Sequence, residues 1–172
     1  LLTEVIEDQT SEDDRQHLWE NFADLTRIIS GSKNHGHLPG RIARNLGERA
    51  TPLMTDDEFF EMVPEDISPL MRDAVLSVLS ASAEMALAGT IDFADQLLFP
   101  TITRCVFPIY QNVLVDEAQD LSELNHTMIA KFAKKRLIAV GDSAQAIYAF
   151  RGAHKEGMPL LAERFKMRTL HL

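Results

Sequence analysis

The sequence predicts an α/β fold in which a mostly helical first half is followed by elements of a parallel sheet. Apolar residues recur at helical spacing from residue 1 to about residue 90. From about residue 91, short aliphatic runs alternate with helical patterns, as strands and crossover helices do in a parallel sheet. We therefore expect a helical part at 1–90 and a sheet-containing part at 91–172.

The first half opens with an expected helix whose apolar residues share one face. Ser11 and Asp14 have the spacing of a capping box, and the helix is expected to end near Ser30–Gly31. The segment 31–40 is rich in Gly, Asn and Pro and is expected to be a loop. The apolar face consists of Leu18, Phe22, Leu25 and Ile29, with Trp19 beside it as a partly buried packing residue.

Two further helices are expected before residue 90. Thr55 and Glu58 form a second capping-box pattern, and Pro64 ends the short helix that this pattern opens. A longer helix then runs to Gly89, which suits a C-terminal cap. Its apolar stripe consists of Leu70, Ala74, Val75, Val78, Leu79, Ser82 and Met85.

Three strands and one helix are expected in the second half. The strands are expected at 112–115, 136–140 and 167–172, buried on both faces. The basic cluster 131–136 is interpreted as the end of the helix, where cations suit the dipole. That helix is expected at 122–133, with Leu124, Met128, Ile129 and Phe132 turned inward.

Acidic and amide side chains directly follow the first two of these strands. The stretch VLVDEAQD places Asp116 and Glu117 behind one strand, and Gly141 and Asp142 follow the next. In open α/β sheets, ligands bind beyond the carboxyl ends of the strands. One carboxylate there can hold Mg²⁺, and its neighbour can polarise a water that attacks a phosphoryl group. An Asp-Glu pair can also simply begin a helix, but two such strand ends indicate the floor of one site.

Aromatic residues follow the second strand end. Tyr148 and Phe150 are two positions apart and precede Arg151. Such a group can offer planar faces and a cation to single-stranded bases, or it can belong to the core and its rim. Gly141 and Gly152 are expected to allow tight backbone turns on either side.

Three stretches resemble motifs of a known family. VLVDEAQD and VGDSAQAIYAFRGA resemble motifs II and III of the UvrD/Rep-like superfamily 1 DNA helicases, and IDFADQLL, Ile91 to Leu98, resembles the acidic-aromatic motif that precedes them. The resemblance implies that 91–172 is the C-terminal half of a first motor domain (1A-like). Its fold would be a partial P-loop NTPase (RecA-like) parallel sheet with helices. It also implies that 1–90 is the mostly α-helical subdomain inserted in that domain (1B-like).

The resemblance also implies roles for single residues. Asp116 would help to coordinate Mg²⁺, Glu117 would orient the attacking water during ATP hydrolysis, and Gln145 would sense the γ-phosphate. Gln119 and Asp120 would link this site to motif III. Phe150 stands where many members have tryptophan. The expected set is Glu117 and Gln145 as catalytic residues, Asp116, Gln119, Asp120 and Asp142 at the cofactor, and Tyr148, Phe150 and Arg151 at the DNA strand.

Composition restricts the classes of partner. The formal net charge of -9 argues against a surface that binds nucleic acid by charge alone, so strand binding must be local. Cys105 is the only cysteine, which excludes an internal disulfide and suggests a reducing compartment. No apolar stretch approaches the roughly 20 residues of a membrane span. We expect a cytoplasmic protein, associated with the nucleoid if it is bacterial.

The expected activity is that of a larger protein. The resemblance implies an internal fragment of an ATP-dependent DNA helicase, of 3′ to 5′ polarity, that couples Mg-ATP hydrolysis to movement on single-stranded DNA and to unwinding of partly duplex DNA. The 172 residues contain no Gly-Lys-Ser/Thr phosphate loop, so the chain alone should not hydrolyse ATP. The parent could instead be the motor of a helicase-nuclease. The alternative from another class is a non-catalytic helicase-like module that binds DNA or a protein partner.

Overall fold

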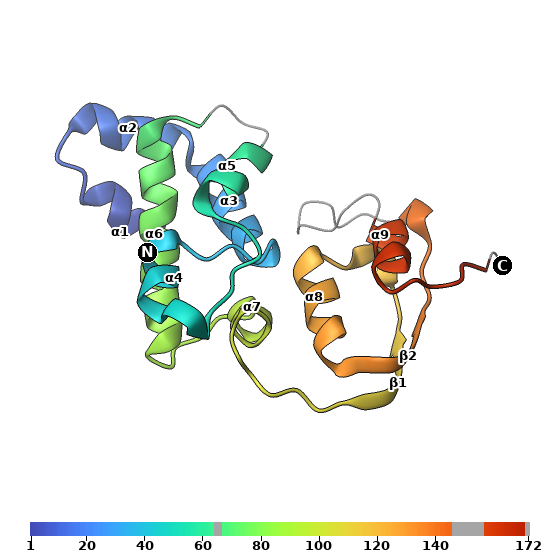
Figure 1. The fold of residues 1–172 in the computed structure, drawn as a ribbon. Coiled ribbons are helices and arrows are strands. Elements are labelled where there is room, and N and C mark those ends of the chain that lie inside the picture. Colours follow the sequence, from blue (N-terminus) through green and yellow to red (C-terminus); the bar gives the residue numbers. More distant parts are fainter. Residues whose placement is uncertain (64–66, 146–156, 171–172) are drawn as a thin grey trace.

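The computed structural model describes residues 1–63, 67–145 and 157–170. Figure 1 shows the helices of the first half gathered around the long helix α6, and the strands of the second half beside α8 and α9. Within the described part, no helix has the length and apolarity to cross a membrane. The helices before the sheet are α1 (Leu2–Glu7), α2 (Glu12–Glu20), α3 (Phe22–Asn34), α4 (Gly40–Leu46), α5 (Asp56–Met62), α6 (Pro69–Leu87) and α7 (Asp95–Ile102).

The expected first helix is two helices that meet at Asn21. Ser11 caps α2 as predicted, by accepting from the amide of Asp14. The Asn21 side chain donates to the carbonyl of His17 at 2.8 Å, which closes α2 before α3 begins. The predicted end near Ser30–Gly31 is wrong, because α3 continues through the glycine to Asn34. The buried contacts of the last turn of α3 outweigh the weak helix preference of glycine.

Most of the other predicted signals of the helical half are confirmed. Thr55 and Glu58 form a complete capping box at the start of α5. Gly89 follows α6 with φ of 102°, a left-handed conformation that suits glycine. Trp19 stacks on Phe22, as expected of a packing residue, but at 42% exposed it is less buried than predicted. Of the predicted α6 stripe, Ala74, Val75, Val78 and Leu79 are buried, whereas Met85 is exposed.

Two apolar clusters form the core. The first lies among the helices α1, α2, α3, α5 and α6, and includes Ile6, Leu18 and Leu25. The second joins both halves of the chain, because Leu98 of α7 and Leu124 of the later helix α8 pack into it beside residues of the helical half. Residues before and after position 90 therefore share this second cluster, although the connecting residues 87–93 are themselves exposed.

The sheet consists, in the described residues, of two parallel strands, β1 (Tyr110–Val115) and β2 (Ala133–Ala139). They include or overlap the predicted strands 112–115 and 136–140, and α8 (Glu123–Phe132) connects them as the predicted crossover helix. Of the four residues predicted to face inward on α8, Leu124 and Ile129 are buried, and Met128 and Phe132 are partly buried. Short 3₁₀ turns at Ala118–Asp120 and Ser143–Gln145 follow the two strands, and α9 (Gly157–Arg164) comes last.

Two expectations for the second half are wrong. Residues 167–170 are not in a strand, because the amide of Met167 donates to the carbonyl of Ala162 at 2.8 Å and completes the end of α9. The strands are not buried on both faces either. Leu114 and Ile138, which are paired in register, are 76% and 46% exposed. Only one face of the described sheet has a helical layer against it (Figure 1).

Candidate functional site

The carboxyl ends of β1 and β2 lie side by side. Val115 is in register with Ala139 in the parallel ladder. The backbone pairing continues past the strands, because the amide of Val140 donates to the carbonyl of Val115 at 2.8 Å and the amide of Ala118 donates to the carbonyl of Val140 at 2.9 Å. The polar segments that follow the two strands are thus held against each other.

Four of the sequence-predicted residues form a continuous series of hydrogen bonds. Gln119 Nε2 donates to Glu117 Oε2 at 2.7 Å, and the amide of Asp142 donates to Gln119 Oε1 at 3.1 Å. Gln145 Nε2 in turn donates to Asp142 Oδ2 at 2.9 Å. Gln119 is buried, whereas the other three are exposed. One buried amide therefore ties the acidic residue after β1 to the segment after β2.

Gly141 makes this link sterically possible. A Cβ at this position would lie 2.4 Å from Gln119 Oε1 and 3.1 Å from the backbone nitrogens of Ala118 and Gln119. The φ of Gly141 is not in the left-handed region that favours glycine, so its backbone conformation does not by itself require a glycine. Its function in the fold is to let the Gln119 side chain approach the backbone of the neighbouring strand.

Glu117 has an unusual backbone conformation. Its φ of 50° and ψ of 40° are left-handed, a region that non-glycine residues occupy infrequently. Such conformations persist where the surroundings enforce them, and they concentrate at functional sites. Here the enforcing contacts are the Gln119 hydrogen bond and the amide of Glu117, which donates to Asp116 Oδ1 at 3.0 Å. No sequence pattern indicated this conformation.

Asp116 fits a magnesium ligand better than Asp142 does. Asp116 is exposed, and its Oδ2 accepts no hydrogen bond from the described residues. An open carboxylate oxygen with room for water suits Mg²⁺, which keeps several waters in most protein sites. Both carboxylate oxygens of Asp142 are occupied, by the amide of Ala144 and by Gln145. Asp142 therefore holds its own turn together in this structure.

The structure describes only some of the remaining predicted residues. Asp120 is partly buried, and its Oδ1 is buried without a hydrogen-bond donor among the described residues. Gly157, at the start of α9, lies against the same loop, because a Cβ there would be 3.5 Å from the carbonyl oxygen of Gln119. The predicted DNA contacts Tyr148, Phe150 and Arg151, together with Gly152, lie outside the described residues.

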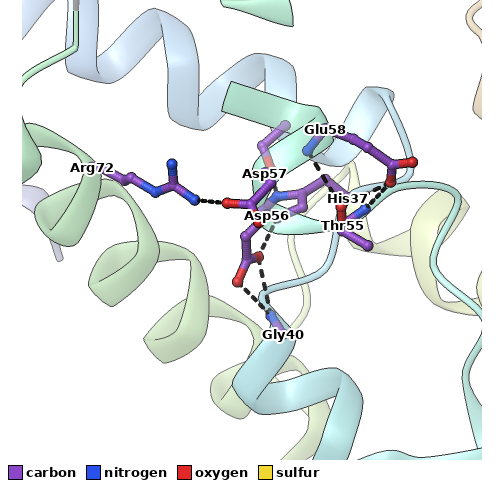
Figure 2. Close-up of polar contacts among 8 residues, drawn as sticks. His37, Gly40, Thr55, Asp56, Asp57, Glu58 and Arg72 are labelled. Atoms are coloured by element: carbon purple, nitrogen blue, oxygen red, sulfur yellow. Dashed lines mark hydrogen bonds and ion pairs between the residues drawn. The ribbon is translucent and has the colours of Figure 1, made fainter. Parts of the chain in front are cut away.

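The helical half contains a second polar network, at the start of α5 (Figure 2). His37 Nδ1 lies 2.7 Å from Ser32 Oγ, and His37 Nε2 lies 2.8 Å from Asp56 Oδ1. Asp56 also accepts from the amide of Gly40. Burial lowers the pKa of His37 and outweighs the opposing effect of Asp56. Ser32 and His37 are 0% and 1% exposed, and Asp56 is partly exposed, so we interpret the contacts of this serine, histidine and aspartate as stabilising the fold.

Comparison with known proteins assigns nearly the whole sequence to one family. A model of the UvrD/REP helicase N-terminal domain matches residues 1–166. The chain belongs to the UvrD/Rep helicase family. The family match includes the helical half, where the sequence motifs had offered no resemblance.

Individual UvrD/Rep relatives match over shorter stretches. DNA helicase II of Haemophilus influenzae is 36% identical over 95 residues, which is 49% of this chain and 13% of the relative. The ATP-dependent DNA helicase Rep of Escherichia coli is 31% identical over 93 residues, 48% of this chain and 14% of the relative. The ATP-dependent DNA helicase UvrD1 of Mycobacterium tuberculosis is 28% identical over 133 residues, 67% of this chain and 17% of the relative. The chain therefore spans less than a fifth of these relatives. No solved structure matches it.

Sequence reasoning missed one buried charge. Lys33 falls in the segment predicted to be a loop, but it lies in the last turn of α3 and forms ion pairs with Asp92 and Asp95. The signal available in the sequence was the resemblance of IDFADQLL to a family motif, which marked both aspartates without naming their partner.

Proposed function

We propose that this chain is part of an ATP-dependent DNA helicase and supplies part of the nucleotide site of the first motor domain. Membership of the UvrD/Rep family supports the proposal. The observation that carries it is the series from Glu117 through Gln119 and Asp142 to Gln145, since it joins the acidic residue after one strand to the amide after the next. Such a connection is what a site that senses bound nucleotide and positions a water requires.

Each residue of the series has a role that its contacts suit. Glu117 Oε2 is held by Gln119, which leaves the exposed Oε1 to accept a hydrogen bond from an attacking water. Asp116 would hold Mg²⁺, directly or through water, with its open oxygen. Bound Mg²⁺ supplies positive charge that stabilises the phosphoryl oxygens. Gln145 would contact the γ-phosphate, and Asp142 fixes its position.

The proposed parent protein supplies what this chain lacks. No Gly-Lys-Ser/Thr sequence occurs in the 172 residues, so the chain alone is not expected to hydrolyse ATP. The rest of the helicase chain would complete the RecA-like sheet and cover its exposed face at Leu114 and Ile138. In this arrangement 1–90 is the inserted helical subdomain and 91–172 is the second half of the motor domain.

The proposed DNA contacts follow the nucleotide site in the sequence. Tyr148, Phe150 and Arg151 would bind the single strand, so hydrolysis and strand movement would share the segment that begins at Gly141. We propose 3′ to 5′ movement on single-stranded DNA, with partly duplex DNA as the substrate for unwinding. We also propose a cytoplasmic location, at the nucleoid in a bacterium. A nuclease domain elsewhere in the protein would be compatible with the same motor.

A second candidate is a helicase-like module that binds DNA or a protein without turnover, which the missing phosphate loop would favour.

The test is DNA-stimulated ATP hydrolysis by the full-length protein with Glu117→Gln. We expect turnover to fall by about a hundredfold or more with nucleotide binding retained, because the water loses its acceptor. The matched control is Glu123→Gln, an exposed acid at the start of α8, which should leave turnover unchanged. Unchanged turnover in Glu117→Gln would refute the role of Glu117, and a full-length protein without ATPase activity would favour the module.

A further inference from the structure

A buried lysine joins the helical half to the helix that leads into the sheet half. Lys33, in the last turn of α3, is 7% exposed. Its Nζ lies 2.6 Å from Asp95 Oδ1, 2.6 Å from Asp92 Oδ2 and 2.9 Å from Ser82 Oγ. These three contacts use all three donors of the ammonium group. Lys33, Ser82, Asp92 and Asp95 are called the Lys33 cluster below.

The two carboxylates of the cluster also organise the start of α7. The amide of Asp95 donates to Asp92 Oδ1 at 2.8 Å, and the amide of Asp92 donates to Asp95 Oδ2 at 3.0 Å. Each carboxylate therefore has one oxygen on the backbone and the other on Lys33. Burial alone would raise the pKa of Asp92, but the Lys33 hydrogen bond, the backbone amides and the Lys33 charge outweigh it and hold the pKa below its usual range.

A second lysine holds the opposite end of α7 from the sheet half. Lys131 of α8 donates to the carbonyl of Thr103 at 3.0 Å and to that of Pro100 at 3.4 Å. Between the two ends, Leu98 of α7 packs with Leu124 of α8 in the second core cluster. The helix α7 is thus fixed at its start by α3 and along its length and end by α8.

The helix α8 begins next to the candidate site. Ser122 caps α8, and only Leu121 separates it from Asp120, the last residue of the loop after β1. A displacement of α7 relative to α3 must therefore move α8 or strain that loop. A buried ion pair resists such displacement, because breaking it leaves an uncompensated charge in the interior.

We propose that Lys33 is a positioning residue for the nucleotide site: through α7 and α8 it sets the geometry of the loop Asp116–Asp120, so that the helical half regulates turnover there. The inference rests on the proposed function for its catalytic consequence. Its structural part, a connection from the Lys33 cluster to the loop, does not depend on that function. The two parts are tested by separate measurements on the same variants.

The experiment uses the full-length protein with Asp92→Asn, Lys33→Met and Lys33→Arg. Asp92 is 54% exposed on its side chain, so Asp92→Asn weakens the cluster while Lys33 keeps Asp95. If Lys33→Met does not fold, Asp92→Asn alone tests the inference. The matched control is Arg41→Met, which removes the exposed ion pair of Arg41 with Glu84 between α4 and α6.

Two readouts are measured on folded protein. We expect Asp92→Asn and Lys33→Met to lower the DNA-stimulated kcat by about fivefold or more, with the KM for ATP changed by less than about twofold. Lys33→Arg should retain at least half of the kcat that Lys33→Met loses, because arginine keeps the positive charge. Hydrogen exchange should quicken at the amide of Ala118, which donates to the carbonyl of Val140, and at the amide of Asp120, which donates to the carbonyl of Glu117. Arg41→Met should change neither readout.

The outcomes separate the two proposals. Unchanged exchange at Ala118 and Asp120 in Asp92→Asn would overturn the inference, whatever the rate of hydrolysis. Faster exchange with an unchanged kcat in an active full-length protein would overturn its catalytic part and leave the cluster a structural connection. A full-length protein that hydrolyses no ATP with single-stranded DNA would count against the proposed function, and the exchange measurement would still decide whether the cluster controls the loop.

Discussion

The polar groups of the helical half and those at the strand ends differ in whether their hydrogen-bonding positions are all occupied. In the helical half, Lys33 uses all three donors, and both ring nitrogens of His37 have partners. At the strand ends, Asp116 and Glu117 each keep one carboxylate oxygen that accepts nothing from the described residues. Buried groups with complete partners stabilise a fold, whereas exposed open acceptors are free to bind a ligand. The comparison supports a structural role for the groups of the helical half and agrees with the ligand-binding role proposed for the strand ends.

The backbone shows the same difference. Among the described residues, the left-handed positions of the helical half are the glycines Gly36, Gly47 and Gly89. In the sheet half they are Glu117 and Lys166, which have side chains. A left-handed residue with a side chain costs free energy that the surrounding contacts must offset. The strained position in the candidate site is thus the residue with the proposed catalytic role.

The largest expected effect on stability lies in the helical core. Leu25 is 0% exposed, and Leu25→Ala should lower the free energy of unfolding by about 2–5 kcal/mol through lost burial and a residual cavity. Leu114→Ala, at a position 76% exposed, should change it by less than about 0.5 kcal/mol. Urea unfolding of the chain measures both. Equal effects of the two substitutions would mean that the sheet face is covered in solution.

A smaller effect is expected from a methyl group at the strand ends. Gly141→Ala should displace the Gln119 side chain and lower the DNA-stimulated kcat of the full-length protein by about tenfold or more, with the KM for ATP little changed. Gly31→Ala is the matched control, because its Cβ would have nothing within 4 Å inside α3. It should leave kcat unchanged and raise stability by about 0.4–1 kcal/mol. A fully active Gly141→Ala enzyme would show that the Gln119 link is dispensable.

The smallest effect is a pH dependence of stability in the helical half. The pKa of His37 is lowered from 6.5 by burial, against the opposing effect of Asp56, so below that pH the unfolded chain binds more protons than the folded one. The contribution of His37 is complete above about pH 6.5 and declines as the pH falls further. Urea unfolding from about pH 7.5 to about pH 5.5 should therefore show a smaller loss of stability in His37→Gln than in the natural chain. His17→Gln is the matched histidine substitution, and its slope is measured beside that of the natural chain.

Local sequence signals predicted helix ends well in the helical half. The capping box of Thr55 and Glu58 and the glycine cap at Gly89 depend on residues within a few positions, and both are confirmed. The extension of α3 to Asn34 was not predictable in this way, because the buried contacts of Lys33 are made with residues 49 to 62 positions away. The strand predicted at 167–172 is absent from the described residues 167–170 for a similar reason, since an apolar run forms a strand only where a neighbouring strand pairs with it.

The sequence predicted where on the sheet the candidate-site residues lie. It did not predict their backbone conformations or atomic contacts. Parallel strands bring their carboxyl ends to one edge, so the order of residues along the chain suffices to place Glu117 and Asp142 near each other. The resemblance to helicase motifs further implied that Gln119 links the two segments. The left-handed backbone of Glu117 and the contact between Gly141 and Gln119 depend on atomic positions that no spacing of residues encodes.

The bare side of the sheet has a practical consequence for work with these 172 residues alone. In the described part, β1 and β2 pair only with each other, so each presents an outer row of amide and carbonyl groups next to uncovered aliphatic side chains. Exposed strand edges of this kind recruit further chains in edge-to-edge association. The 172-residue polypeptide should therefore aggregate at high concentration, and co-expression with the rest of the proposed parent protein should reduce that aggregation.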